Sequence, residues 1–194
     1  MRKKVVKSLI YAQLSFFACL FIDVLITTKG FTHDRGLSFY GEHLNTVIPF
    51  ALGFMLCDVF LLRAATMLPK LGSAFNAFRV PLRVLAVLIS LIVLTPDNLN
   101  SIFNVMHILS SSTLFLFELA LSFWLIVRWC NTRLSWVLFT GQFIAGIIAG
   151  LSEIQLSRYL SEATLFYQLI FSSLIIWTMI NVLKPGQEVE AEDN

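Results

Sequence analysis

The amino-acid sequence predicts an all-α fold, a membrane-embedded bundle of six transmembrane helices. Hydrophobic residues make up 57% of the 194 residues and charged residues only 13%, whereas a soluble domain carries roughly 25% charged residues. The apolar residues fall into six stretches, each close to the length of about 20 residues with which a helix crosses a bilayer. Basic residues gather at alternate ends of these stretches. Together these features place most of the chain in lipid.

The six stretches are continuously apolar and lack the period-two alternation of a membrane barrel strand. A helix satisfies its backbone hydrogen bonds internally, as a segment in hydrocarbon requires. The first stretch is too long for the apolar region of a secretory signal, so we expect a retained span. The expected spans are 5–27, 45–64, 80–96, 102–127, 134–156 and 161–183. Residues 1–184 are expected to form one transmembrane domain, and residues 185–194 a disordered, acidic cytoplasmic tail.

Lys and Arg are unevenly divided between the two sides of such a bundle. With the amino terminus in the cytosol, only Lys29, Arg35 and Arg158 lie on the opposite side. Cytoplasmic loops carry an excess of basic residues, so both termini are expected in the cytoplasm. In the inner loop 64–80, Phe75 and Phe78 are expected to dip into the headgroups. The eleven cytoplasmic basic residues are Arg2, Lys3, Lys4, Lys7, Arg63, Lys70, Arg79, Arg83, Arg128, Arg133 and Lys184.

Several classes of function lack their sequence signatures. A net charge of +2 with no long basic run gives no support for nucleic-acid binding. Cys19, Cys57 and Cys130 are odd in number and widely spaced, which disfavours a disulfide framework. The chain has no Gly-x-Ser-x-Gly, Walker loop or His-Glu-x-x-His motif. No cofactor is therefore expected, and the sequence leans against an enzyme.

Ionisable residues inside the spans are candidates for a site, because a charge costs roughly 3 kcal/mol at mid-bilayer and normally faces protein or water. The fourth span places His107, Ser111 and Glu118 on one helical face. Asp58 is expected to meet either an Arg, such as Arg63 or Arg128 on the inner side, or a hydroxyl. Such residues either form a functional site or join the helices by hydrogen bonds. The candidate polar interior comprises Asp23, Asp58, His107, Ser111, Glu118, Gln142 and Glu153.

The fifth span carries a small-xxx-small pair, Gly146 and Gly150, with Gln142 on the same side. Small residues let two membrane helices approach closely, so this face is expected to receive a partner helix. The partner helix belongs either to the same chain or to a second copy in a homo-oligomer.

Histidines and carboxylates gather on the outer side under this topology. His33, His43 and His107 lie there, and four acidic residues fall on the same side. Such groups can bind Zn²⁺ and activate water when they converge. However, no two of them have ligand spacing on one helix, and the alternative is a solvated loop folded over the bundle mouth. The acidic members are Asp23, Asp34, Glu42 and Glu153, and the candidate outer-loop site is Ser38, Gly41, Glu42 and His43.

The stretch Gly36-Leu-Ser-Phe-Tyr-Gly-Glu-His43, followed by Asn45-Thr-Val-Ile-Pro-Phe50, resembles the first outer loop and second span of the DRAM/Frag-type six-span membrane proteins. Many members also have a His early in the fourth span, which His107 matches. The resemblance covers about a third of the chain, and the usual acidic-glycine pair stands here in reverse order, as Gly41-Glu42. It implies a six-helix bundle, lipid handling and no established catalytic set, and it singles out Ser38, Gly41 and His107.

The leading hypothesis is a non-catalytic integral membrane protein that binds a lipid headgroup or organises the membrane, with membrane lipids as its partners. One alternative is a small proton-coupled transporter with Asp58, Glu118 and His107 as relay groups. The other is a metal-dependent lipid hydrolase with its site at the outer face. Short loops and the absence of glycosylation sequons favour the plasma membrane of a prokaryote.

Overall fold

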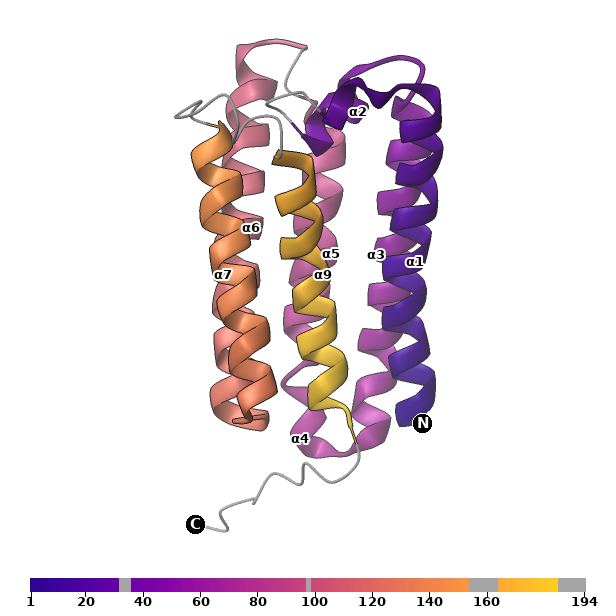
Figure 1. Cartoon of the computed structure of the whole chain (residues 1–194). Coiled ribbons are helices and arrows are strands. Elements are labelled where there is room, and N and C mark those ends of the chain that lie inside the picture. Colours follow the sequence, from indigo (N-terminus) through magenta and orange to yellow (C-terminus); the bar gives the residue numbers. More distant parts are fainter. Residues whose placement is uncertain (32–35, 97–98, 154–163, 185–194) are drawn as a thin grey trace.

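A computed structural model describes residues 1–31, 36–96, 99–153 and 164–184. All secondary structure in these ranges is helical, which confirms the all-α prediction. Six long helices run side by side, and short helical segments lie in the connections between the first three of them (Figure 1). The long helices are α1 (Arg2–Ile26), α3 (Val47–Met67), α5 (Arg79–Leu94), α6 (Ser101–Trp129), α7 (Arg133–Glu153) and α9 (Thr164–Val182). The short ones are η1 (Thr28–Phe31), α2 (Leu37–Glu42), η2 (Leu68–Leu71) and α4 (Ser73–Asn76).

The long helices form a closed ring in chain order. Each packs on the next, from α1 to α3, α5, α6, α7 and α9, and α9 returns to α1. In addition, α6 contacts α9. Because successive helices are antiparallel, the start of α1 and the end of α9 lie at one end of the ring, beside α4 (Figure 1). We call this end the basic end, since the eleven basic residues fall there, and the opposite end the α2 end.

The outside of the ring is apolar, as a lipid-facing surface requires. Large hydrophobic side chains are exposed on every long helix. In the described part of the chain, six helices are long and apolar enough to cross a bilayer. These features are those of an integral, multi-pass membrane protein. One exposed side chain from each helix illustrates the pattern: Phe21, Met55, Val87, Leu116, Ile144 and Trp177.

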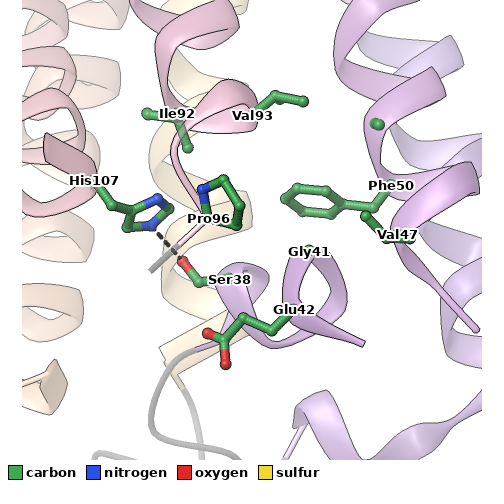
Figure 2. Close-up of a pocket in the computed structure, with 10 residues that line it drawn as sticks. Ser38, Gly41, Glu42, Val47, Phe50, Ile92, Val93, Pro96 and His107 are labelled. Carbon is green, nitrogen blue, oxygen red and sulfur yellow. Dashed lines mark hydrogen bonds between the residues drawn. The ribbon is translucent and has the colours of Figure 1, made fainter. Parts of the chain in front are cut away.

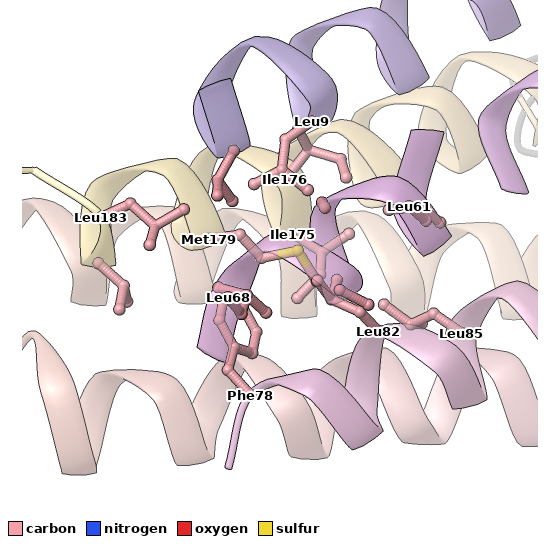
Figure 3. Packing of buried hydrophobic residues seen from close by; sticks show 14 of the residues in the cluster. Leu9, Leu61, Leu68, Phe78, Leu82, Leu85, Ile175, Ile176, Met179 and Leu183 are labelled. Atoms are coloured by element: carbon pink, nitrogen blue, oxygen red, sulfur yellow. The ribbon is translucent and has the colours of Figure 1, made fainter. Parts of the chain in front are cut away.

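The largest buried cluster lies toward the basic end (Figure 3). Leu9 of α1, Leu61 of α3, Leu82 of α5 and Met179 of α9 are almost fully enclosed there. Phe75 and Phe78 were expected to dip into the headgroups, but both are buried in this cluster. The expectation is wrong for these residues because the segment from η2 to the start of α5 folds back against the ring and closes its basic end.

A second, smaller cluster lies at the α2 end. It joins Phe39 and Tyr40 of α2 to side chains of α1, α3 and α9. The sequence allowed a solvated loop over the bundle mouth. The described part of that loop is instead largely helical, because Phe39 and Tyr40 bury their rings against the ring of helices. The partners are Phe16, Leu20, Phe50 and Leu165.

Candidate functional site

A pocket with a cavity volume of about 70 Å³ lies at the α2 end between α2, α3, α5 and α6, within about 400 Å³ of empty space that includes its open mouth (Figure 2). We call it the α2 pocket. Ser38, Glu42 and His107 provide its polar groups, whereas the side chains from α3 and from the end of α5 are apolar. Figure 2 shows His107 and Phe50 on opposite sides of the pocket. The full lining is Ser38, Gly41, Glu42, Val47, Phe50, Ala51, Ile92, Val93, Pro96 and His107.

The short helix α2 is attached to the ring at both of its ends. Before its first residue, Gly36 has a φ of 54°, and a Cβ there would collide with Gln168 of α9. Gln168 Oε1 accepts a hydrogen bond from the Leu37 amide at 2.8 Å. Toward the other end, the buried Thr46 hydroxyl donates to the Tyr40 carbonyl at 2.7 Å. These contacts fix the position of the α2 residues that line the pocket.

Ser38 and His107 are directly hydrogen-bonded, although 69 positions separate them in sequence. Ser38 Oγ lies 3.1 Å from His107 Nε2, and His107 Nδ1 lies 2.8 Å from the Thr95 carbonyl oxygen. A carbonyl can only accept, so Nδ1 carries a proton, and in the tautomer whose single proton is on Nδ1 the other nitrogen, Nε2, is free to accept. Nε2 is then the acceptor, and the Ser38 hydroxyl donates to it.

The other residues of the predicted outer-loop site divide into two groups. Gly41 and Glu42 line the α2 pocket. His43 does not: its side chain is exposed, its Nδ1 lies 2.7 Å from the Phe39 carbonyl, and its ring packs on Phe39 with centroids 4.0 Å apart. The pocket therefore contains three of the four predicted residues, together with His107 from the predicted polar interior.

Asp23 is fully buried in the last turns of α1. Within the described structure, neither of its carboxyl oxygens has a hydrogen-bond partner, and the same holds for the buried Tyr40 hydroxyl. Burial, and secondly the Asp23 carboxyl, raise the pKa of Tyr40 above its ordinary value. Tyr40 is therefore a neutral phenol at physiological pH.

Asp58 and Glu118 lie in the interior, away from the α2 pocket. Asp58 accepts a hydrogen bond from Ser90 Oγ at 2.6 Å, because this face of α3 packs on α5. The partner of Asp58 is thus a hydroxyl, which is one of the two kinds of partner expected from the sequence. Glu118 is buried, and its Oε2 has no hydrogen-bond partner within the described part of the chain.

Ser111 is not part of the buried interior that the sequence predicted. It is half-buried, and its hydroxyl donates to the Ile108 carbonyl of its own helix at 3.1 Å. All buried residues of α6 lie from Glu118 onward, because the first half of the helix is only partly covered. The expected polar face from His107 to Glu118 is therefore not continuous inside the ring.

On α7, the small-residue face meets helices of the same chain. A Cβ on Gly146 would collide with the Phe115 ring of α6 and come within 2.9 Å of Phe171 of α9, and these two rings stack 4.7 Å apart. Gln142 is fully buried and accepts a hydrogen bond from Ser122 Oγ at 2.6 Å. A Cβ on Gly150 would have no neighbour within 4 Å. Contact with a second copy of the chain therefore stays a prediction at Gly150 only.

The metal alternative draws no support from side-chain positions. Over the described ranges, no group of three or more His, Cys, Asp or Glu side chains is placed to hold a metal ion. His33 and Asp34, which the hypothesis invoked, lie outside the described residues, as do the side chain of Glu153 and the predicted tail 185–194.

Comparison of the chain with protein-family models, curated proteins and solved structures finds no match. The resemblance to the DRAM/Frag-type proteins therefore rests on its residues alone. The three residues that it singles out, Ser38, Gly41 and His107, all line the α2 pocket.

Sequence reasoning missed the apolar half of this pocket and the residues that position its polar half. Ala51 and Ile92 carry no signal that separates them from ordinary lipid-facing residues. Thr95 acts through its backbone carbonyl, which no side-chain pattern reveals. Gln168 had a usable signal, since it is a polar residue in a hydrophobic span and polar residues there tend to find partners.

Proposed function

We propose that this protein binds a membrane lipid in the α2 pocket, with the polar part of the lipid beside Ser38, Glu42 and His107. The observation that carries the proposal is the amphipathic lining. Polar groups occupy the α2 and α6 side, and hydrophobic side chains from α3 and α5 form the remainder. Small-molecule sites are typically mostly apolar with a few polar groups that fix orientation, and an amphiphile matches this lining.

The position of the pocket in the ring supports a lipid over a water-soluble ligand. Exposed hydrophobic side chains flank it: Ile48 on α3 and Leu94 on α5 are 75% and 69% exposed. These side chains place hydrocarbon beside the apolar part of the pocket. The polar lining lies at the end of the spans, where lipid headgroups meet the acyl chains.

We further propose that the α2 end faces away from the cytoplasm and that both termini are cytoplasmic. All eleven basic residues of the basic end support this orientation. The plasma membrane of a prokaryote fits the short loops and the absence of sequons. A fluorescent reporter that folds only in the cytosol tests the orientation, since fusions at either terminus should fluoresce. Fusions that are expressed but do not fluoresce would indicate the opposite orientation.

Native mass spectrometry of the purified protein tests lipid binding, with Ala51→Phe as the test variant. Ala51 lines the pocket and is half-buried, so a phenyl ring there should fill the apolar side and displace the lipid. The matched control is Leu52→Phe, the next residue of α3, whose side chain is 49% exposed on the outside.

Wild type and Leu52→Phe should retain a lipid, and Ala51→Phe should lose it. Equal retention by the two variants would show that lipid binds outside the α2 pocket. A wild-type protein without any retained lipid would remove the proposal.

The two alternatives have less support from the geometry. A proton-coupled carrier needs its relay groups joined by a polar path, but Glu118 does not line the pocket that His107 lines, and Ser111 between them bonds to its own helix. A metal-dependent hydrolase needs a ligand cluster, and the described residues provide none.

A further inference from the structure

We propose that Ser38 and His107 form a nucleophile–base pair that hydrolyses an acyl ester of the lipid bound in the α2 pocket. The inference rests on the proposed lipid binding and assigns a reaction to it. The observation that carries it is the hydrogen-bonded chain from Ser38 Oγ to His107 Nε2 at 3.1 Å, and from His107 Nδ1 to the Thr95 carbonyl at 2.8 Å.

This chain contains the three roles that an activated serine requires. A nucleophile lies within hydrogen-bond reach of a base, and a third group orients the base. The Thr95 carbonyl holds the proton on Nδ1, so that the free lone pair of Nε2 points at the serine hydroxyl. Such arrangements are recognised by geometry and roles rather than by sequence motif. The absence of Gly-x-Ser-x-Gly therefore does not exclude this one.

The surroundings hold both side chains in place. α2, which carries Ser38, is tied to α9 by the Leu37–Gln168 hydrogen bond and to the start of α3 by Thr46. Thr95, which orients His107, is itself buried, with its hydroxyl bonded to the Leu91 carbonyl at 2.7 Å. The pair is therefore positioned by three helices before any substrate arrives, as catalysis by orientation requires.

The substrate is a membrane lipid with an acyl ester. The Ser38 hydroxyl lies in the polar part of the lining and next to its apolar part, which is where an ester carbonyl between headgroup and acyl chain would lie. A water-soluble ester lacks a long apolar part that could pack against the hydrophobic side chains of α3 and α5, whereas an acyl chain packs against them.

The reaction proceeds in two balanced steps. Ser38 Oγ attacks the ester carbonyl carbon while its proton moves to His107 Nε2. The bond to the alcohol part of the lipid breaks, and His107 returns the proton to the leaving alkoxide. Water, deprotonated by His107, then attacks the acyl-serine carbonyl. The bond from carbon to Oγ breaks, the proton returns to Ser38, and a fatty acid is released.

An alkyl fluorophosphonate, which forms a covalent bond with a serine activated by a base, tests this inference on the purified full-length protein in detergent. Mass spectrometry of the digested protein should locate the adduct on Ser38, and Ser38→Ala should carry none there. His107→Gln should be labelled at least about 100-fold more slowly, the usual contribution of a general base. Ser111→Ala, on the same helix as His107, should be labelled like wild type.

Two further measurements separate catalysis from structure. The thermal midpoint of His107→Gln in detergent shows whether the variant is folded, and native mass spectrometry shows whether it still holds lipid. A folded, lipid-bound His107→Gln with slow labelling supports the pair as catalytic. An unlabelled Ser38 in a wild-type protein that retains its lipid would overturn the inference and leave lipid binding intact. Equal labelling of wild type and His107→Gln would also overturn it.

Discussion

Polar side chains inside the ring mostly serve to connect helices. Ser122 of α6 donates to Gln142 of α7 at 2.6 Å, and both residues are completely buried. Asn181 of α9 donates to Ser135 of α7 at 2.9 Å. Interhelical hydrogen bonds between such residues stabilise membrane bundles by about 0.6 kcal/mol on average and up to about 1.7 kcal/mol.

Ser122→Ala should lower the stability of the protein in detergent by about 1 kcal/mol. The substitution removes the hydrogen-bond donor to Gln142 Oε1. Because Gln142 Nε2 already lacks a partner in the described structure, the buried amide then loses its hydrogen bond. A lowered thermal midpoint measures the effect. Ser111→Ala is the control, because that hydroxyl is half-buried and bonds only within α6. Equal midpoints for the two variants would contradict this account of Gln142.

The sequence shows which polar residues belong in the interior but not which atoms they meet. Asp58 and Gln142 are polar residues in apolar spans, where exposure to lipid is costly, and both are buried. Their partners, Ser90 and Ser122, depend on which helices are neighbours and on how each is rotated about its axis. Ser111 was placed in the interior by helical spacing alone, and spacing cannot reveal that the first half of α6 is thinly covered.

At the scale of elements, α7 is fitted into the ring by a glycine. Gly146 lets the stacked rings of Phe115 and Phe171 approach the α7 backbone, and so brings α6 and α9 against the same helix. Small residues at membrane-helix contacts permit this kind of close approach. Gly150, one turn further on, has open space where a side chain would project.

Gly146→Ala should destabilise the protein by about 1–3 kcal/mol, because the added methyl group collides with two aromatic rings that have little room to move. Gly150→Ala, the matched change on the same helix, should have no unfavourable effect. The midpoints of thermal unfolding of the two variants in detergent, measured as the fraction of protein that stays monodisperse after heating, provide the comparison. A larger loss for Gly150→Ala would indicate that its face is an interface with a second chain.

The long elements were predictable, and the short ones were not. A continuous apolar run of about 20 residues crosses lipid as a helix, so the six spans follow from composition and length. The six-residue helix α2 forms because Phe39 and Tyr40 pack into a hydrophobic cluster and because Gln168 accepts a hydrogen bond from the amide of its first residue, Leu37. Both causes are contacts between residues far apart in the sequence, and the local sequence of α2 does not predict them.

At the scale of the whole molecule, each pair of helices that are consecutive around the ring is joined by a hydrogen bond that involves a side chain. These bonds lie at different depths, so they connect the ring along its length. The α2 pocket lies where one of them, between His107 and the Thr95 carbonyl at the end of α5, also fixes the orientation of a side chain that lines it. The six links are Ser8–Phe60, Asp58–Ser90, Thr95–His107, Ser122–Gln142, Ser135–Asn181 and Ser173–Gln13.

The most direct test of lipid binding in this pocket is photo-crosslinking in liposomes, with a phospholipid that carries a diazirine near the carbonyl end of its acyl chain. Mass spectrometry of the crosslinked peptides locates each contact. We predict an excess of crosslinks at Ala51, Ile92 and Val93 over the exposed Val59 of α3, and loss of this excess in Ala51→Phe. Crosslinks that fall equally on the pocket and on the outer faces of the helices, unchanged in Ala51→Phe, would contradict the account.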